Sequence, residues 1–183
     1  MKSIWLIVCL IFICGAANAQ TPTVSPSMAL LDPLIGDWQG STRHFRPRNA
    51  EIDERTETLE GTCRPILDGY YIVCITELTR PDGRTRALHS YTNYNAANEN
   101  FEFLLIFRGW SGKIIYPLEW NDEDKMFVGF HDDETRDGTP IKVRVEFGFS
   151  EDGREHWARE FNNIEGEPED YWPQTFEMSR QKR

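Results

Sequence analysis

The sequence predicts an all-β protein, built as a single antiparallel up-and-down β-barrel of about eight to ten strands. Three observations lead to this fold class. Short segments that alternate between apolar and polar residues follow one another along most of the chain, which is the period-two pattern of strands with one buried face. Turn residues separate these segments, and helical periodicity is almost absent. A meander of this length must either close into a barrel or stack as a sandwich, because open edge strands invite aggregation, and we expect the closed barrel.

The N-terminus predicts a cleavable export signal over residues 1–19. Lys2 supplies a positive charge, and the uncharged apolar run after it is shorter than the roughly 20 residues of a permanent membrane-spanning helix. Ala17 and Ala19 are small residues at the two positions that a signal peptidase recognises. We therefore expect an exported protein, periplasmic or secreted, with an N-terminal membrane anchor as the alternative.

The rest of the chain is expected to form one domain. Residues 20–33 are interpreted as a Thr/Pro/Ser tether with a short helical turn, capped by Ser27 and stopped by Pro33. Residues 34–183 are interpreted as the barrel domain, with no further membrane span. The chain carries 20 Lys and Arg against 30 Asp and Glu, a formal net charge of −10. Nucleic acids and anionic membranes need basic surface, so both are disfavoured as partners.

Turn residues place the strands of the first half. Asp68-Gly69 is a strong hairpin signal, and residues 81–83, Pro-Asp-Gly, mark a second turn. The alternating segments around these turns predict strands over residues 38–45, 55–63, 70–78 and 87–94.

The alternation is cleaner in the second half. Apolar residues from Val143 to Phe149 alternate with charged ones, as in a strand with one buried and one solvated face. Leu104 and Ile106 instead make their strand apolar on both faces. Strands are predicted over residues 101–107, 114–120, 126–131, 141–150, 155–161 and 175–179.

Two cysteines remain after removal of the signal, Cys63 and Cys74, and we expect them to form a disulfide. A tight turn at Asp68-Gly69 places residue 63 opposite residue 74, and directly opposed residues point to the same face of a hairpin. An oxidising compartment favours the bond. Closing so short a loop is expected to stabilise the fold by roughly 3 kcal/mol. A register slipped at Pro65 and a reactive thiol pair are the alternatives.

Three segments of the chain resemble the calycin or lipocalin-like superfamily. They are Leu-Ile-Gly-Asp-Trp-Gln-Gly at residues 34–40, the Asp-Gly-Tyr hairpin at residues 68–70, and the turn from Tyr94 to Phe101. The sequence is similar, more closely, to a calycin-like domain family of unknown function in exported bacterial proteins. The resemblance covers nearly all of the chain after the signal and implies the same barrel.

The resemblance also implies structural roles at the closed end of the barrel. Trp38 would pack across that end, Gly36 would allow a tight turn into the strand, and Gly40 would allow a bend. In lipocalin-like barrels an arginine from a late strand stacks on this tryptophan. Arg159, or alternatively Arg180, is expected to do so here through a cation–π contact.

A barrel of this strand number has room for one small apolar ligand. The leading hypothesis is therefore a binding protein for a small hydrophobic molecule. If the barrel is hollow, we expect its ligand-binding wall to be formed by Phe103, Leu105, Tyr116, Val145 and Phe147. A core filled by aromatic side chains, as in an envelope or interaction domain without a ligand, is one alternative.

An enzyme acting on a lipid-like substrate is the other alternative, with His44, His131 or Glu119 as acid–base groups. No catalytic motif supports it. No cofactor is expected, although haem-binding barrels start with a similar Leu-x-Gly-x-Trp-x-Gly segment, and their axial histidine would correspond to His156. No metal is expected either, because the histidines lack zinc spacing and the acidic residues 131–138 lack calcium-loop spacing.

Overall fold

The computed structural model describes residues 23–44, 55–109, 111–134, 138, 140–164 and 174–181. The predicted export signal lies outside these residues. Within them the chain forms ten strands and two short 3-10 helices. The strands are β1 (Gly36–His44), β2 (Arg55–Ile66), β3 (Tyr71–Thr79), β4 (Thr85–Asn95), β5 (Asn100–Phe107), β6 (Ile114–Asn121), β7 (Met126–Glu134), β8 (Pro140–Phe149), β9 (Glu155–Ile164) and β10 (Gln174–Arg180).

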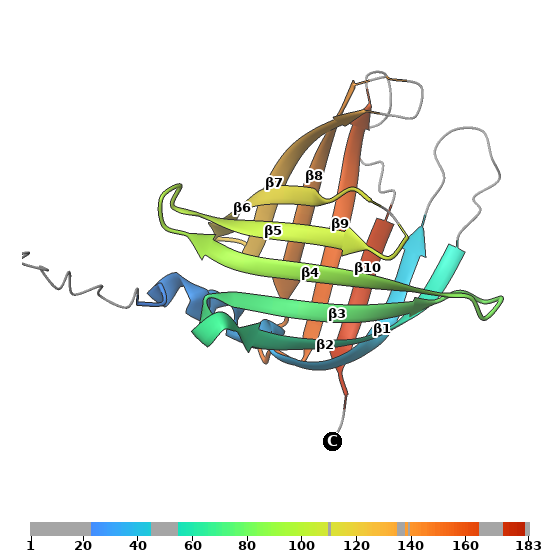
Figure 1. Ribbon diagram of the computed structural model, residues 1–183, viewed down its shortest axis with the longest axis horizontal. Helices are drawn as coiled ribbons and strands as arrows, with labels where there is room; N and C mark the ends of the chain where they lie inside the picture. The colour runs from blue at the N-terminus through green and yellow to red at the C-terminus, as the bar shows by residue number, and fades with distance from the viewer. Residues whose placement is uncertain are drawn as a thin grey trace, which may run out of the picture.

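These strands form one closed antiparallel barrel, so the predicted fold class is confirmed. Each strand pairs with its neighbour in the sequence, and β1 pairs with β10 to close the sheet. In Figure 1 the strands from β2 to β5 run side by side and cross the direction of β8 and β9. The barrel is therefore flattened, with two layers whose inner faces enclose the core.

The β2–β3 hairpin has the predicted register. Cys63 lies opposite Cys74 and forms the expected disulfide with it. Pro65 stays within the ladder opposite Ile72, so it does not shift the pairing. The turn is a short 3-10 helix, η2 (Leu67–Gly69), in which Asp68 adopts a left-handed backbone with φ of 56°.

The N-terminal helical turn differs from the prediction. It is a 3-10 helix, η1 (Pro26–Leu34), capped by the Ser25 hydroxyl oxygen, which accepts from the Ser27 amide nitrogen at 3.3 Å. Ser25, and not the predicted Ser27, therefore takes the capping position, because Pro26 favours the first helical position. The helix also continues through Pro33 to Leu34. It buries Met28, Leu31 and Leu34 against the barrel.

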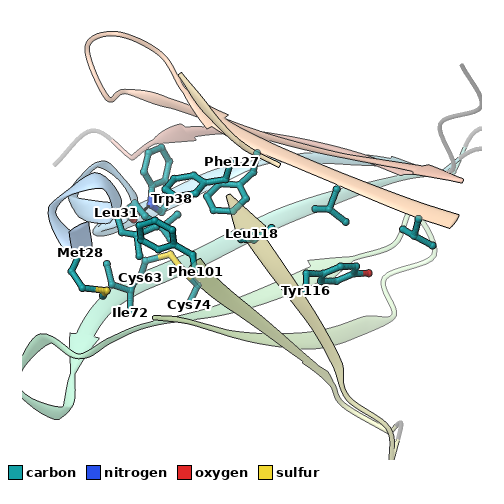
Figure 2. Packing of buried hydrophobic residues seen from close by; sticks show 14 of the residues in the cluster. Met28, Leu31, Trp38, Cys63, Ile72, Cys74, Phe101, Tyr116, Leu118 and Phe127 are labelled. Carbon is teal, nitrogen blue, oxygen red and sulfur yellow. Dashed lines mark hydrogen bonds between the residues drawn. A yellow bond between two sulfur atoms is a disulfide. The ribbon is translucent and has the colours of Figure 1, made fainter. Parts of the chain in front are cut away.

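Helix η1 covers one end of the barrel, which we call the helix end. A Cβ built on Gly153 in the β8–β9 turn would lie 3.8 Å from the Pro33 Cβ, and one built on Gly69 in the β2–β3 turn would lie 3.8 Å from the Val24 Cγ2, so both turns lie close to this segment. The opposite end, which carries the β3–β4 turn, is the loop end. In Figure 2 most of the labelled core side chains gather beside η1, whereas Tyr116 lies apart, further along the barrel. The interior is thus densely filled at the helix end.

Candidate functional site

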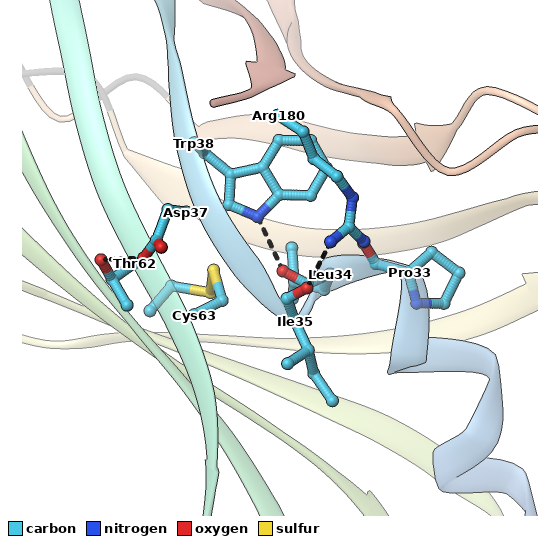
Figure 3. The surroundings of a disulfide bond; sticks show 9 residues. Pro33, Leu34, Ile35, Asp37, Trp38, Thr62, Cys63 and Arg180 are labelled. Carbon is cyan, nitrogen blue, oxygen red and sulfur yellow. Dashed lines mark hydrogen bonds between the residues drawn. A yellow bond between two sulfur atoms is a disulfide. The ribbon is translucent and has the colours of Figure 1, made fainter. Parts of the chain in front are cut away.

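Trp38 and Arg180 close the helix end of the barrel. Trp38 is 1% exposed and donates its indole Nε1–H to the Leu34 carbonyl oxygen at 2.8 Å. The Arg180 guanidinium lies 5.0 Å from the centre of the Trp38 ring. It also donates to the carbonyl oxygens of Pro33 and Ile35, at 2.8 and 2.9 Å, so it ties the barrel to η1 (Figure 3).

The expectation that Arg159 stacks on Trp38 is wrong. Register explains the difference, because Arg180 lies directly opposite Trp38 in the β1–β10 pair and so shares its face. On β9 the side chain of His156 faces the interior, and residues three apart on a strand face opposite sides. Arg159 therefore faces outward, where its guanidinium lies 4.8 Å from the centre of the Trp157 ring.

Both predicted glycines of β1 allow close approaches. At Gly36, φ is +150° and a Cβ would lie 2.7 Å from the Arg180 Nη1 atom, so a side chain would displace the guanidinium. At Gly40 a Cβ would collide with the carbonyl oxygen of Glu177 on β10. The resemblance predicts a bend at Gly40, whereas the structure shows close contact between β1 and β10 there.

An apolar cavity of about 120 Å³ lies inside the barrel beyond Trp38. Leu34 and Trp38 form its floor at the helix end, and Phe107 and Ile114 line it at the loop end. The disulfide forms part of the wall. The predicted wall residues all line this one cavity: Phe103, Leu105, Tyr116, Val145 and Phe147. The alternation in the sequence thus identified five side chains, on three strands, that face the same interior space.

His156 is the buried titratable group of the cavity wall. Its Nδ1 atom lies 3.2 Å from the Gly148 carbonyl oxygen, a contact that requires a hydrogen on Nδ1 and leaves Nε2 as an acceptor. Its ring packs against Trp38 and Phe149, with centroids 5.8 and 5.5 Å away. Burial lowers the pKa of His156 to about 4, although the contact with Gly148 opposes that shift.

Acid is expected to destabilise the protein through His156. An unfolded histidine has its ordinary pKa of 6.5 and the folded one a pKa of about 4, so below pH 6.5 the unfolded chain binds a proton that the folded chain excludes. The contribution of the neutral His156 to the free energy of unfolding is complete above pH 6.5. It is lost as the pH is lowered from 6.5 to about 4. Urea unfolding at pH 7 and 5 should show a loss about 2 kcal/mol larger in the wild type than in His156→Gln. Equal losses would contradict this assignment.

The polar groups of the cavity were missed by sequence reasoning. Ser90 and Thr76 line it beside the disulfide, and Glu160 lines it on β9. Ser90 is buried. Each of these residues occupies an inward position two residues from an apolar one, so strict period-two counting would have placed them inside. Their small number leaves the lining mostly apolar.

A buried ion pair lies toward the loop end of the interior. Glu57 on β2 is 1% exposed, and its carboxylate accepts from Arg80 at 3.1 Å and from Arg86 at 2.7 Å. The alternation with Leu59, another buried residue, places Glu57 on the inward face. That alternation was visible in the sequence, although the two arginines could not be assigned to Glu57 without the fold.

The acid–base residues of the enzyme alternative do not form one site. Glu119 is exposed on the outer face of β6. His131 packs edge-on against Tyr116, with ring centroids 5.6 Å apart, and does not line the cavity. The side chain of His44 lies outside the described part of the structure. Glu119 and His131 cannot act on one bound molecule in this arrangement.

No group of three or more metal-binding side chains is found within the described residues. Much of the acidic segment 131–138 falls outside them. None of the described helices is long and apolar enough to cross a membrane.

The closed ten-stranded barrel is compatible with a calycin-like fold. Comparison of the chain with known protein families finds no match, and comparison with curated proteins finds none either.

Proposed function

We propose that this protein is an exported lipocalin-like barrel that binds one small, uncharged, mostly apolar molecule. The observation that carries the proposal is the cavity of about 120 Å³, whose lining is apolar except for a few polar groups. A core with empty apolar volume loses packing energy, which a ligand of matching shape restores. The disulfide and the predicted signal at residues 1–19 support export.

The volume indicates the size of the ligand. An engineered apolar cavity of about 150 Å³ is known to bind benzene, whereas pockets for drug-sized ligands measure roughly 300–1,000 Å³. We therefore propose a ligand near the size of a single aromatic ring. A haem would need a larger cavity than this one, so we do not propose haem as the ligand.

His156 indicates the polarity of the ligand. Its Nδ1–H is held by the Gly148 carbonyl oxygen, so Nε2 is the atom able to accept a hydrogen bond from a ligand. Burial disfavours the imidazolium, so His156 offers an acceptor and no positive charge. A phenol or a small alcohol fits this wall better than a carboxylate does.

Ligand binding can be tested with residues 20–183 and fluorobenzene. Binding should broaden and shift the ¹⁹F resonance in the wild type. Ala158→Phe adds a ring to the cavity wall and should weaken binding by at least about tenfold, while Val128→Phe, on the opposite face of the sheet, should not. Absence of binding in the wild type would instead favour a closed-core interaction domain. Equal binding in Ala158→Phe would place the ligand elsewhere.

The role of His156 needs a second comparison. Phenol and toluene have nearly the same shape, but only phenol donates a hydrogen bond. The dissociation constant of phenol divided by that of toluene should be lower for the wild type than for His156→Phe. Circular dichroism confirms that the variant folds. An unchanged ratio of the two dissociation constants would refute the hydrogen bond while leaving the apolar site intact.

A further inference from the structure

The outer surface of β3–β6 carries a continuous apolar patch. The strand pairing places four outward residues in one row: Val73, Tyr91, Leu104 and Ile115. In the next row, His89 lies between Ile75 and Ile106. Ile75, Ile106 and Ile115 are 52%, 38% and 44% exposed. We call these six apolar residues the outer apolar patch. Apolar side chains gathered in this way on an outer face mark an interaction surface more often than isolated ones do.

Charged residues of opposite sign lie along one edge of the patch. Glu77 follows Ile75 on β3, with Glu60 beside it on β2. Arg108 follows Ile106, and its amide donates to the carbonyl oxygen of Ala87, the residue opposite Glu77. Lys113 directly precedes β6, at the same end of the barrel as Arg108. None of these four side chains forms an ion pair with another described residue.

This arrangement is self-complementary about a line along β4. Rotation of a second copy by 180° about that line, followed by face-to-face contact, exchanges the positions of β3 and β5. Ile75 then faces Ile106 of the second copy, and Val73 faces Leu104. The same rotation brings Glu77 against Arg108 and Glu60 toward Lys113. We propose that the protein forms a two-fold symmetric homodimer through the outer apolar patch.

The extent of the patch supports a second copy as the partner. Strands about 4.8 Å apart, with outward residues about 6.8 Å apart along each, give roughly 260 Å² for the patch itself, which spans four strands and two rows. The sheet face around it, with β2 and one further row on each side, covers roughly 650 Å². Interfaces of standard size bury about 800 Å² on each partner. In Figure 1 the strands β3, β4 and β5 lie side by side, which presents this area as one layer. The charged edge also favours this two-fold axis, because the axis brings each glutamate toward a basic residue of the second copy.

Sedimentation velocity of residues 20–183 over a range of about 5–200 µM tests the proposal. The wild type should sediment as a dimer at the upper concentrations. Ile106→Arg should be monomeric, whereas Phe130→Arg, which changes an exposed apolar residue on β7 outside the patch, should remain dimeric. A wild type that is monomeric throughout, or a dimer that Ile106→Arg leaves intact, would overturn the proposal.

A charge exchange tests the two-fold geometry without depending on the apolar residues. Glu77→Arg places two arginines opposite each other and should raise the dimer dissociation constant at least about tenfold. Adding Arg108→Glu exchanges the signs and should restore most of the affinity. If the double variant associates no better than the single one, Glu77 and Arg108 do not face each other and the proposed axis is wrong. Both residues are exposed, so folding is not at risk.

Discussion

Trp38→Ala is expected to lower the free energy of unfolding by about 4 kcal/mol. Removal of this buried ring leaves a void at the floor of the cavity, where η1 already fills the space around it. Two further interactions are lost with the indole: its hydrogen bond to the Leu34 carbonyl oxygen and the contact with the Arg180 guanidinium. The substitution should therefore loosen the attachment of η1 as well as the barrel core.

Urea unfolding followed by circular dichroism measures this loss, and Trp157→Ala is the matched control. Trp157 is half-buried on the outer face, with Arg159 over its ring, so its removal leaves no enclosed void. It should cost less than half as much as the loss of Trp38. Hydrogen exchange of the η1 amides should also accelerate in Trp38→Ala alone. Equal losses in the two variants would show that Trp38 is not the central residue of the closed end.

Glu57→Leu is expected to lower the free energy of unfolding by about 3 kcal/mol. The carboxylate is the shared partner of Arg80 and Arg86, and without it two guanidinium groups lie close together at a partly enclosed site. The estimate is at the lower end for a broken buried ion pair because the arginine side chains are 31% and 30% exposed and retain part of their hydration.

The same urea titration checks this prediction, with Glu119→Leu as the control. Glu119→Leu removes an exposed carboxylate and should change the free energy of unfolding by no more than about 0.5 kcal/mol. The double variant Glu57→Leu/Arg86→Met should recover part of the loss, because it removes one of the two guanidinium groups that Glu57→Leu leaves close together. A double variant less stable than Glu57→Leu would mean that Arg86 stabilises the barrel through other contacts.

The strands, the disulfide and the cavity wall could all be predicted, because each follows from local alternation or a single turn. The Asp68-Gly69 turn determines which residues face each other across the β2–β3 hairpin, and Cys63 and Cys74 lie within a few residues of it. The wall residues, such as Phe103 and Val145, were found because period-two counting separates inward from outward side chains. That they bind a ligand remains a prediction.

Other features depended on contacts between distant segments. Whether Arg159 or Arg180 stacks on Trp38 is decided by the register of β1 against β10, which no local pattern encodes. The inward position of Glu57 could be counted, but its arginine partners come from the β3–β4 hairpin, 23 and 29 residues away. The size of the cavity follows from how all ten strands pack together.

The sequence by itself therefore determined the barrel: its Gly36-Asp37-Trp38 start, the order of its strands and the inward face of the predicted apolar wall. Alternation and turn chemistry act over a few residues, so they can be read directly. Only the tertiary structure decided how the barrel closes. Arg180 reaches the Ile35 carbonyl oxygen across 145 residues of sequence, and that closure seals the helix end while the cavity lies beyond Trp38. Closure is a property of the whole sheet. The register of β1 against β10 depends on the twist and stagger of every strand from β2 to β9.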